Sequence, residues 1–549
     1  MKKIVNYTIS ILLIIFSILS FYSSAYAKND CENVKLSNEY WYFDFGKGSV
    51  ADGFEKITKA DKYTNKTGFG FYGKEIIKSV NQNTGDEIRE DYCLSKSNKV
   101  YYFKANVPDG TYNITFVAGD KRIKNITYVD ILKDKSTDKI KLSSKASEYD
   151  QQSITANVKG GIIDLAIKGK LSSIEISKIT KFDFGPGEVE PGYTQITADT
   201  VYNEDSGYGF LDTSVITEEI RDDLTNLTND FCTGGDFAFD VDIPKGSYEI
   251  IVYSGDSETK SLTSTRAYAE GLLQMVGIGE RVGKVGKESY PLNLNDNKMN
   301  LRFTGWPGYL NGLEIIKQPE SWLDKRPTIF IASDSTVQSY KSYAYPQMGW
   351  GQVLAKYLTD DVLIDNHAIG GRSTKSYLEE GSLDTVMSRA EAGDYLLIQF
   401  GHNDASSVES RHTDPYDDFK TNLYEFIDIA RDSGVTPILI TPVGRRSYNS
   451  NGLFKNDFSD YCTAIKQVSE EKDVQIIDLM SKSINYYNSV GIEETKDIFL
   501  WLEAGEYENF PNGISDNTHF QEYGANEIVK ILVNSFIEDK IDELANYVR

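Results

Sequence analysis

A serine stands where a buried strand is expected to end. Ile329–Ile331 is a β-branched and aromatic run typical of a buried strand, and the chain then breaks into Ser333-Asp334-Ser335-Thr336. Open α/β sheets bind ligands at the carboxyl ends of their strands, so this turn could present Ser335 as a nucleophile. Ser-Asp-Ser is also common in ordinary turns, and the interpretation depends on partners elsewhere in the chain.

A histidine that could take the proton of such a serine lies near the other end of the chain. His519 follows Asp516 by three residues, in a predicted loop just before the last helix. In a tight loop this spacing brings the carboxylate within reach of the imidazole Nδ1, which leaves Nε2 to act as base. His402 is the competing histidine. It ends a predicted strand, where a neutral imidazole bonded to the backbone would have only a structural role.

Two further stretches complete a pattern of four. Asn366–Ser373 reads NHAIGGRS, and Gln399–Asp404 reads QFGHND. With the Ser335 stretch and with DNTHF at Asp516–Phe520, they resemble in order and spacing the four blocks of the SGNH (GDSL) hydrolases. Within that superfamily the pattern is most similar to the rhamnogalacturonan acetylesterases.

This resemblance implies a role for each block. Ser335 would be the nucleophile and Asp516 and His519 the acid–base pair, with no metal or other cofactor in the chemistry. The oxyanion donors would be the backbone amides of Ser335 and Gly371 and the side-chain amide of Asn403. Glycine lets the backbone approach a ligand without a Cβ in the way, and a neutral amide donor does not titrate, so both residue types suit this role.

The first block departs from the family pattern at one position. It usually reads Gly-Asp-Ser, whereas this chain has Ser333 in place of the glycine. If the glycine serves to reach a positive φ, Ser333 would be strained or the turn would differ.

The second half of the chain alternates predicted strands and helices. Strands are expected over 329–331, 362–364, 394–400, 436–441 and 474–479, and helices over 349–358, 383–392, 419–431, 459–471 and 524–544. This alternation predicts a parallel sheet covered on both faces. The resemblance implies the same architecture, an α/β/α flavodoxin-like fold.

The first half contains an internal repeat. Phe43-Asp44-Phe45-Gly46 recurs as Phe182-Asp183-Phe184-Gly185, and the same offset maps Gly68–Phe71 onto Gly207–Phe210. This indicates two homologous modules in tandem. Their short alternating strands and turn signals predict antiparallel β-sandwiches, or jelly rolls.

The modules resemble the galactose-binding-like domains of bacterial polysaccharide-active esterases and agarases. The resemblance implies carbohydrate binding, in which an aromatic face stacks on a sugar ring. We expect the repeated phenylalanines to lie in the core, and Trp306, on a turn-rich loop, to be the candidate sugar platform. The alternative is that the modules act only as spacers.

The sequence predicts five segments: a signal peptide over 1–27, module 1 over 28–179, module 2 over 180–317, a polar linker over 318–327 and a hydrolase domain over 328–549. Lys2 and Lys3, the apolar run Ile9–Phe21 and the cleavage pattern Ala25-Tyr26-Ala27 indicate the signal peptide. We therefore expect a secreted, extracellular protein with no membrane contact after cleavage.

The formal net charge of −24 argues against a nucleic acid or an anionic membrane as partner. An anionic sugar would then need local cations. Arg372, Arg445 and Arg446 are the candidates, because arginine holds carboxylates with two parallel hydrogen bonds. A structural salt bridge is the alternative for each.

The four cysteines have no Cys-x-x-Cys spacing, so neither a zinc site nor a redox site is expected. Cys93 and Cys232 are interpreted as buried small side chains. A Cys31–Cys93 disulfide and structural calcium in the β-sandwich modules are left open.

These observations predict a secreted esterase that deacetylates plant cell-wall polysaccharide (pectin), with rhamnogalacturonan as the first candidate. One alternative is an acetylxylan or other carbohydrate esterase of the same fold. Another is a non-catalytic polysaccharide-binding or adhesion protein whose SGNH domain has decayed, although all five expected catalytic and oxyanion residues are present. A lipase is not favoured, because the blocks differ from the Gly-x-Ser-x-Gly elbow. The oligomeric state is not predicted.

Overall fold

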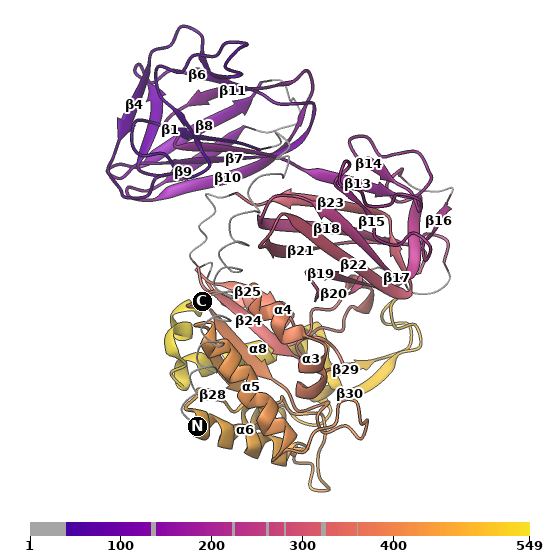
Figure 1. Cartoon of the computed structure of the whole chain (residues 1–549). Coiled ribbons are helices and arrows are strands. Elements are labelled where there is room, and N and C mark those ends of the chain that lie inside the picture. Colours follow the sequence, from indigo (N-terminus) through magenta and orange to yellow (C-terminus); the bar gives the residue numbers. More distant parts are fainter. Residues whose placement is uncertain are drawn as a thin grey trace, which may run out of the picture. The chain divides into compact units, whose positions relative to one another are not determined.

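A computed structural model describes residues 40–132, 139–221, 225–259, 263–278, 282–319, 326–359 and 361–549. The predicted signal peptide, Cys31 and most of the predicted linker lie outside these residues. The chain divides into two compact units, one running to Ile179 and the other beginning at Thr180, with 243–245 and 295–298 counted in the first unit. Module 2 and the α/β domain therefore belong to the same unit (Figure 1).

The α/β domain is built on five parallel strands in the order β25-β24-β26-β27-β28, which is the strand order of the flavodoxin-like fold. This confirms the predicted parallel sheet. The strands are β24 (Thr328–Ser333), β25 (Leu363–Asn366), β26 (Tyr395–Gln399), β27 (Thr436–Ile440) and β28 (Ile476–Ile477).

Helices cover both faces of this sheet. Alternate strand residues point to opposite faces, so Ile329 and Ile331 pack with α2 and α8, whereas Phe330 and Ala332 pack with α3 to α6. The helices are α2 (Trp350–Val353), α3 (Thr374–Glu379), α4 (Ser382–Met387), α5 (Asp418–Asp432), α6 (Ser459–Lys472), α7 (Leu479–Val490) and α8 (Glu522–Glu538). Short 3₁₀ turns are η1 (Ser342–Ala344), η2 (Leu354–Tyr357), η3 (Glu494–Asp497) and η4 (Asp542–Tyr547).

Several predicted bounds were wrong. The helix expected over 349–358 is a single α-helical turn that continues as η2, the helix expected over 383–392 ends at Met387, and the last helix ends at Glu538. Helices α3 and α7 and the antiparallel hairpin of β29 (Phe499–Leu502) and β30 (Ile514–Phe520) were not predicted. Helix α3 spans six residues, which is too short to show helical periodicity, and it depends on a capping box between Ser373 and Ser376.

Module 1 is a β-sandwich of two five-stranded sheets. One contains β10 (Tyr149–Val158), β7 (Gly110–Gly119), β12 (Ser173–Lys178), β1 (Tyr40–Phe45) and β2 (Glu55–Ile57). The other contains β3 (Phe69–Tyr72), β6 (Tyr101–Asn106), β11 (Ile162–Lys168), β8 (Asn125–Ile131) and β9 (Ile140–Ser144), and β4 (Ile77–Asn81) pairs with β5 (Asp91–Ser95) as a hairpin. The pairing is antiparallel except for β1 with β2, which run parallel.

Module 2 repeats this arrangement. Its first sheet contains β14 (Thr194–Ile196), β13 (Thr180–Phe184), β23 (Gly312–Lys317), β18 (Gly246–Gly255) and β21 (Val285–Leu294). Its second contains β15 (Tyr208–Phe210), β17 (Asp230–Asp242), β22 (Lys298–Leu310), β19 (Thr265–Ala269) and β20 (Leu272–Ile278), with β16 (Thr217–Ile220) paired to β17. The parallel pair β13–β14 has the register of β1–β2 shifted by the repeat offset.

The repeated residues form the two cores. Phe43 and Phe45 are buried in module 1, and Phe182 and Phe184 are buried in module 2, as expected. Cys93 and Cys232 are buried, and neither forms a disulfide with another described residue.

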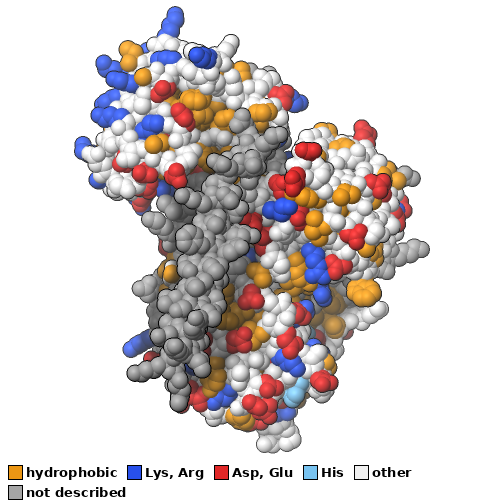
Figure 2. Space-filling model, in the orientation of Figure 1, with side chains coloured by type: hydrophobic (Ala, Val, Ile, Leu, Met, Phe, Trp, Pro, Cys, Tyr) orange, Lys and Arg blue, Asp and Glu red, His pale blue; other side chains and the backbone are white. Residues whose placement is uncertain are grey.

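The acidic charge of the chain is dispersed. Figure 2 shows acidic side chains spread across the visible surface with basic ones among them. Among the described residues, no helix is both long and apolar enough to cross a membrane.

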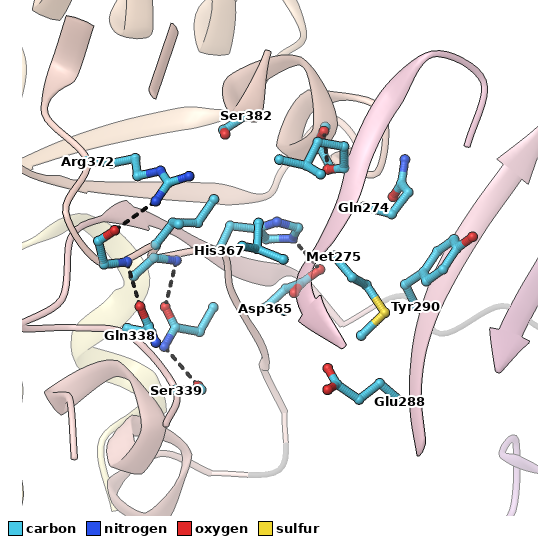
Figure 3. A pocket seen from close by; sticks show the side chains of 18 of the residues that line it. Gln274, Met275, Glu288, Tyr290, Gln338, Ser339, Asp365, His367, Arg372 and Ser382 are labelled. Carbon is cyan, nitrogen blue, oxygen red and sulfur yellow. Dashed lines mark hydrogen bonds and ion pairs between the residues drawn. The ribbon is translucent and has the colours of Figure 1, made fainter. Parts of the chain in front are cut away.

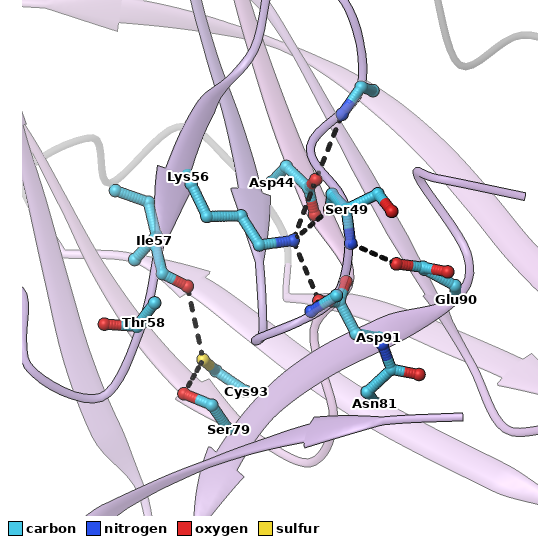
Figure 4. Close-up of polar contacts among 12 residues, drawn as sticks. Asp44, Ser49, Lys56, Ile57, Thr58, Ser79, Asn81, Glu90, Asp91 and Cys93 are labelled. Carbon is cyan, nitrogen blue, oxygen red and sulfur yellow. Dashed lines mark hydrogen bonds and ion pairs between the residues drawn. The ribbon is translucent and has the colours of Figure 1, made fainter. Parts of the chain in front are cut away.

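One buried ion cluster distinguishes the two modules. Figure 4 shows Lys56 pointing between Asp44 and Asp91, and its Nζ donates to their Oδ2 atoms at 3.1 and 2.8 Å. Both carboxylates are fully buried. Burial and the charge of Asp91 raise the pKa of Asp44 to about 7 even though Lys56 opposes the shift. At the position of Lys56, module 2 has Gln195.

We predict that Lys56→Met destabilises module 1 by about 3 kcal/mol at pH 8, because two buried carboxylates lose their counter-ion. Asp44 has a folded-state pKa of about 7 against an ordinary value of 3.8, so its ionisation lowers stability as pH rises through that interval. The loss should therefore be smaller at pH 5. Calorimetry of the full chain measures it, with the exposed Lys59→Met as control. Equal effects of the two substitutions, or a loss independent of pH, would contradict the account.

Candidate active site

Three side chains from opposite ends of the α/β domain meet at the carboxyl edge of the sheet. Ser335 follows β24, and its Oγ lies 2.9 Å from the Nε2 of His519. The Nδ1 of His519 lies 2.7 Å from the Oδ2 of Asp516. The sequence predicted a loop here, but Asp516 and His519 lie on β30, an irregular strand directly before α8. The amides of Thr518 and His519 donate to the Asp516 Oδ1 at 2.6 and 3.0 Å, which bends the strand and orients the carboxylate.

The electrostatics of this pair suit a histidine base. Burial alone would raise the pKa of Asp516, but its hydrogen bond to His519 and the accompanying charge interaction lower that pKa to about 2. Asp516 is thus ionised at neutral pH and holds the proton on Nδ1. The Nε2 lone pair is then free to accept the proton of Ser335.

The three predicted oxyanion donors belong to Ser335, to the loop whose Gly370 packs beside Ser335, and to Asn403, which is bonded to that loop. Within the described residues, the backbone amides of Ser335 and Gly371 make no hydrogen bond, and Gly371 has φ of 80°, which favours glycine. The Nδ2 of Asn403 donates one hydrogen to the Arg372 carbonyl at 3.0 Å and keeps the other. The arrangement can hold an oxyanion.

Arg411 was not predicted, and it orients one of these donors. Its Nη1 donates to the Asn403 Oδ1 at 3.3 Å, which fixes which end of the amide faces the site. Arg411 lies in the polar stretch after the third block. Nothing in its sequence context distinguishes it from a solvated arginine, so only the folded structure identifies it.

Asp404, the last residue of the third block, is hydrogen-bonded to Thr374, which directly follows the second block. Its Oδ1 accepts from the backbone amide and the Oγ1 of Thr374 at 3.0 and 2.6 Å and from the Oγ1 of Thr413 at 3.1 Å. Burial raises the pKa of Asp404 to about 7. These bonds hold the start of α3, and with it the loop that carries Gly371.

His402, the competing histidine, packs against the turn that carries Ser335. The Nδ1 of His402 lies 3.3 Å from the Oδ2 of Asp334. Its partner is therefore a carboxylate, whereas the sequence had suggested a backbone group. Burial raises the pKa of Asp334, but His402 and the bonds from Thr336 bring it below its ordinary value. The Oδ1 of Asp334 accepts from the backbone amide and the Oγ1 of Thr336, which closes the turn around Ser335.

Ser333 causes no strain. It ends β24, is not among the residues with positive φ, and donates its Oγ to the Gln399 carbonyl at 2.6 Å. A serine therefore fits where the family pattern has glycine.

The candidate substrate-binding residues fall into different environments. Arg446 is buried and donates to the Thr495 Oγ1 and the Ile492 carbonyl, so we no longer regard it as a substrate contact. Arg372 binds the Gly370 carbonyl and Glu380, which supports the oxyanion loop. The predicted salt-bridge alternative thus fits Arg372, whereas the hydrogen-bond partners of Arg446 named above are a neutral hydroxyl and a carbonyl.

Arg445 and Trp306 remain candidates for substrate binding. The Arg445 guanidinium lies over the Phe458 ring, and among the described residues no carboxylate pairs with it. Burial lowers the pKa of Arg445, and the negative charges of Asp457, Asp334 and Asp516 partly oppose that shift. Trp306 is fully exposed, but it lies within β22 and not on a loop. Among the described residues, no group of three or more His, Cys, Asp or Glu side chains is arranged to hold a metal ion.

Comparisons with known proteins agree with this geometry. The family "GDSL-like Lipase/Acylhydrolase" matches residues 329–532, and "Beta-agarase/YXIM esterase-like, galactose-binding domain-like" matches 41–137 and 180–309. The rhamnogalacturonan acetylesterase RhgT of Bacillus subtilis is 42% identical over 39% of this chain and 91% of its own length. The uncharacterized esterase YxiM of the same organism is 29% identical over 59% of this chain and 85% of its own. The crystal structure of YxiM gives a TM-score of 0.55 at 25% identity and covers 66% of this chain and 99% of that one.

We predict that Asn403→Ala lowers kcat on p-nitrophenyl acetate by about 10²–10³-fold with little change in KM, because its donor acts on charge that develops only in the transition state. Arg411→Met, which keeps the amide but frees its orientation, should cost less. Steady-state kinetics measures both. A change confined to KM would place Asn403 in ground-state binding.

We predict that Asp516→Asn lowers kcat by about 10³–10⁴-fold, because an amide no longer holds the proton on Nδ1. Because the pKa of Asp516 is about 2, its own protonation should produce no limb in the pH–rate profile of the unmodified protein above pH 4. An Asp516→Asn protein with near-normal kcat would rule out this carboxylate as the partner of His519.

Proposed function

Because the chain belongs to the GDSL-like lipase/acylhydrolase family, we propose that this ester hydrolase removes acetyl groups from pectic polysaccharide, with rhamnogalacturonan as its first substrate. The main support for ester hydrolysis is the series of hydrogen bonds from Ser335 through His519 to Asp516. It supplies a nucleophile, a base and an orienting carboxylate.

In the first step, the Ser335 Oγ attacks the acetyl carbonyl carbon while His519 Nε2 accepts its proton. The carbonyl oxygen becomes an oxyanion, which the amides of Ser335 and Gly371 and the Nδ2 of Asn403 stabilise. Collapse of this intermediate breaks the bond to the sugar oxygen. His519 gives its proton to that oxygen, and the acetyl group stays on Ser335.

In the second step, water takes the place of the sugar. His519 accepts a proton from the water as it attacks the acetyl-serine, and the same donors hold the second oxyanion. Collapse expels the Ser335 oxygen, which regains the proton from His519, and acetate leaves.

Two observations support a pectic substrate. RhgT, whose name records action on rhamnogalacturonan, is 42% identical over the catalytic domain. A galacturonate-containing chain also offers carboxylates. The Arg445 guanidinium, which pairs with no carboxylate among the described residues, lies within electrostatic range of Asp516 and Asp334 and could bind one at the site. Export, as the signal pattern predicts, would bring the protein to such a substrate.

We predict that acetate release is fastest from acetylated rhamnogalacturonan in a panel that also contains acetylated homogalacturonan, xylan and mannan. Ser335→Ala should lower the rate by at least roughly 10³-fold on every substrate, including p-nitrophenyl acetate. Faster release from xylan would favour the acetylxylan esterase alternative. Equal low rates for the two proteins on all substrates would favour a decayed, non-catalytic domain.

A further inference from the structure

A cavity of about 470 Å³ lies within the second compact unit, between module 2 and the α/β domain. Module 2 contributes β20 and β21, and the α/β domain contributes the segment after Ser335, the end of β25 and the α4 region. Figure 3 shows Gln274, Met275 and Glu288 on the module side of the cavity and Asp365 and His367 on the other. The volume lies in the range of small-molecule sites.

Direct contacts fix the two walls relative to each other. The Thr385 Oγ1 donates to the Leu273 carbonyl at 2.9 Å, and the Arg389 Nη2 donates to the Gln274 Oε1 at 2.7 Å. Glu288 on β21 forms an ion pair with Lys341. Because these bonds bridge the walls, the cavity belongs to one packed body.

Three buried polar groups in the cavity wall lack a partner among the described residues. They are the hydroxyls of Tyr290 and Ser382, each residue being 3% exposed, and the Nε of Arg389. Buried donors are normally satisfied, and an unmade hydrogen bond is unfavourable. These three atoms have almost no accessible surface, so the groups that can reach a ligand are the more open polar side chains of the wall, such as Gln338 and Ser339.

The charges of the wall are already balanced. Asp365 pairs with His367 at 3.0 Å and with Arg389 at 3.3 Å, and Glu288 pairs with Lys341. Aromatic rings, including Tyr340 and Tyr377, complete the wall. Paired charges, the uncharged polar groups of Gln338 and Ser339, and aromatic rings suit a neutral sugar, whose hydroxyls both donate and accept, better than they suit an anion.

The cavity adjoins the nucleophile. Gly370 lines it, and a Cβ at Gly370 would lie 3.5 Å from the Ser335 Cβ. Tyr340, which also lines it, donates its hydroxyl to the Ser335 carbonyl at 2.8 Å. A polymer with its acetyl group at Ser335 would therefore have a neighbouring unit near the cavity mouth.

We propose that this cavity is a subsite for a neutral pyranose unit of the polysaccharide chain, so that module 2 takes part directly in substrate recognition. The proposal rests on the proposed function, in that the occupant is part of a polysaccharide. It does not depend on which polysaccharide that is.

The test places a bulky side chain in the cavity by substituting a residue of module 2 that lines it. Met275 on β20 is a partly exposed residue that lines the cavity, and Met275→Trp should obstruct it (Figure 3). Leu272→Trp, three residues earlier on the same strand and outside the lining, is the matched control. Met275→Trp should raise KM on the acetylated oligosaccharide that the unmodified protein prefers by about tenfold or more, and leave p-nitrophenyl acetate hydrolysis within about twofold. Leu272→Trp should change neither.

Binding is measured separately from hydrolysis. In the Ser335→Ala protein, saturation-transfer NMR with deacetylated rhamnogalacturonan and xylan oligosaccharides should show binding that Ser339→Ala weakens and Met275→Trp reduces strongly. Binding unaffected by these changes would place the sugar elsewhere and overturn the proposal. If Met275→Trp lowered the rate on p-nitrophenyl acetate as much as on the oligosaccharide, the proposal would also be overturned, because catalysis itself would be disturbed. Absence of deacetylation by the unmodified protein refutes only the proposed function, since the binding arm still decides the subsite.

Discussion

The hydrogen bond between His519 Nε2 and Ser335 Oγ is the interaction on which the proposed catalysis depends. It joins residues 184 positions apart at 2.9 Å. Ser335 stands on the turn after the first strand of the sheet, and His519 stands on the last hairpin, which leads directly into α8. Because α8 packs against the face of the sheet that carries Ile329 and Ile331, the core positions the base relative to the nucleophile.

Behind this bond lies a buried polar layer. Asp334 with His402 and Asp404 with Thr374 and Thr413 are enclosed beneath the two active loops. Burying Asp404 is unfavourable, as its raised pKa shows, and its hydrogen bonds only partly offset the cost. At Asp334, His402 and the bonds from Thr336 outweigh burial and lower the pKa. In return, the turn around Ser335 and the loop that carries Gly371 are held before any substrate arrives, which is what electrostatic stabilisation of a transition state requires.

The sequence was informative where a feature is local and less so where it depends on distant packing. The five strands of the sheet show apolar runs, and the repeat beginning at Phe43 revealed both sandwiches. Helix α3 and the β29–β30 hairpin escaped prediction, since a six-residue helix and an irregular hairpin carry little periodicity. Arg411 and the environment of Arg446 could not be predicted, because each is defined by contacts between side chains far apart in sequence or in neighbouring loops. The contact between module 2 and the α/β domain is likewise a property of the folded chain.

The account's central claim is that hydrolysis passes through an acetyl group on Ser335. Rapid acid quenching during turnover of an acetate ester, followed by mass spectrometry of the digested protein, tests it directly. We expect a single acetyl group on the peptide that contains Ser335, formed and lost at rates compatible with turnover. Turnover without any acetylated peptide, or an acetyl group that accumulates on a different residue, would contradict the mechanism.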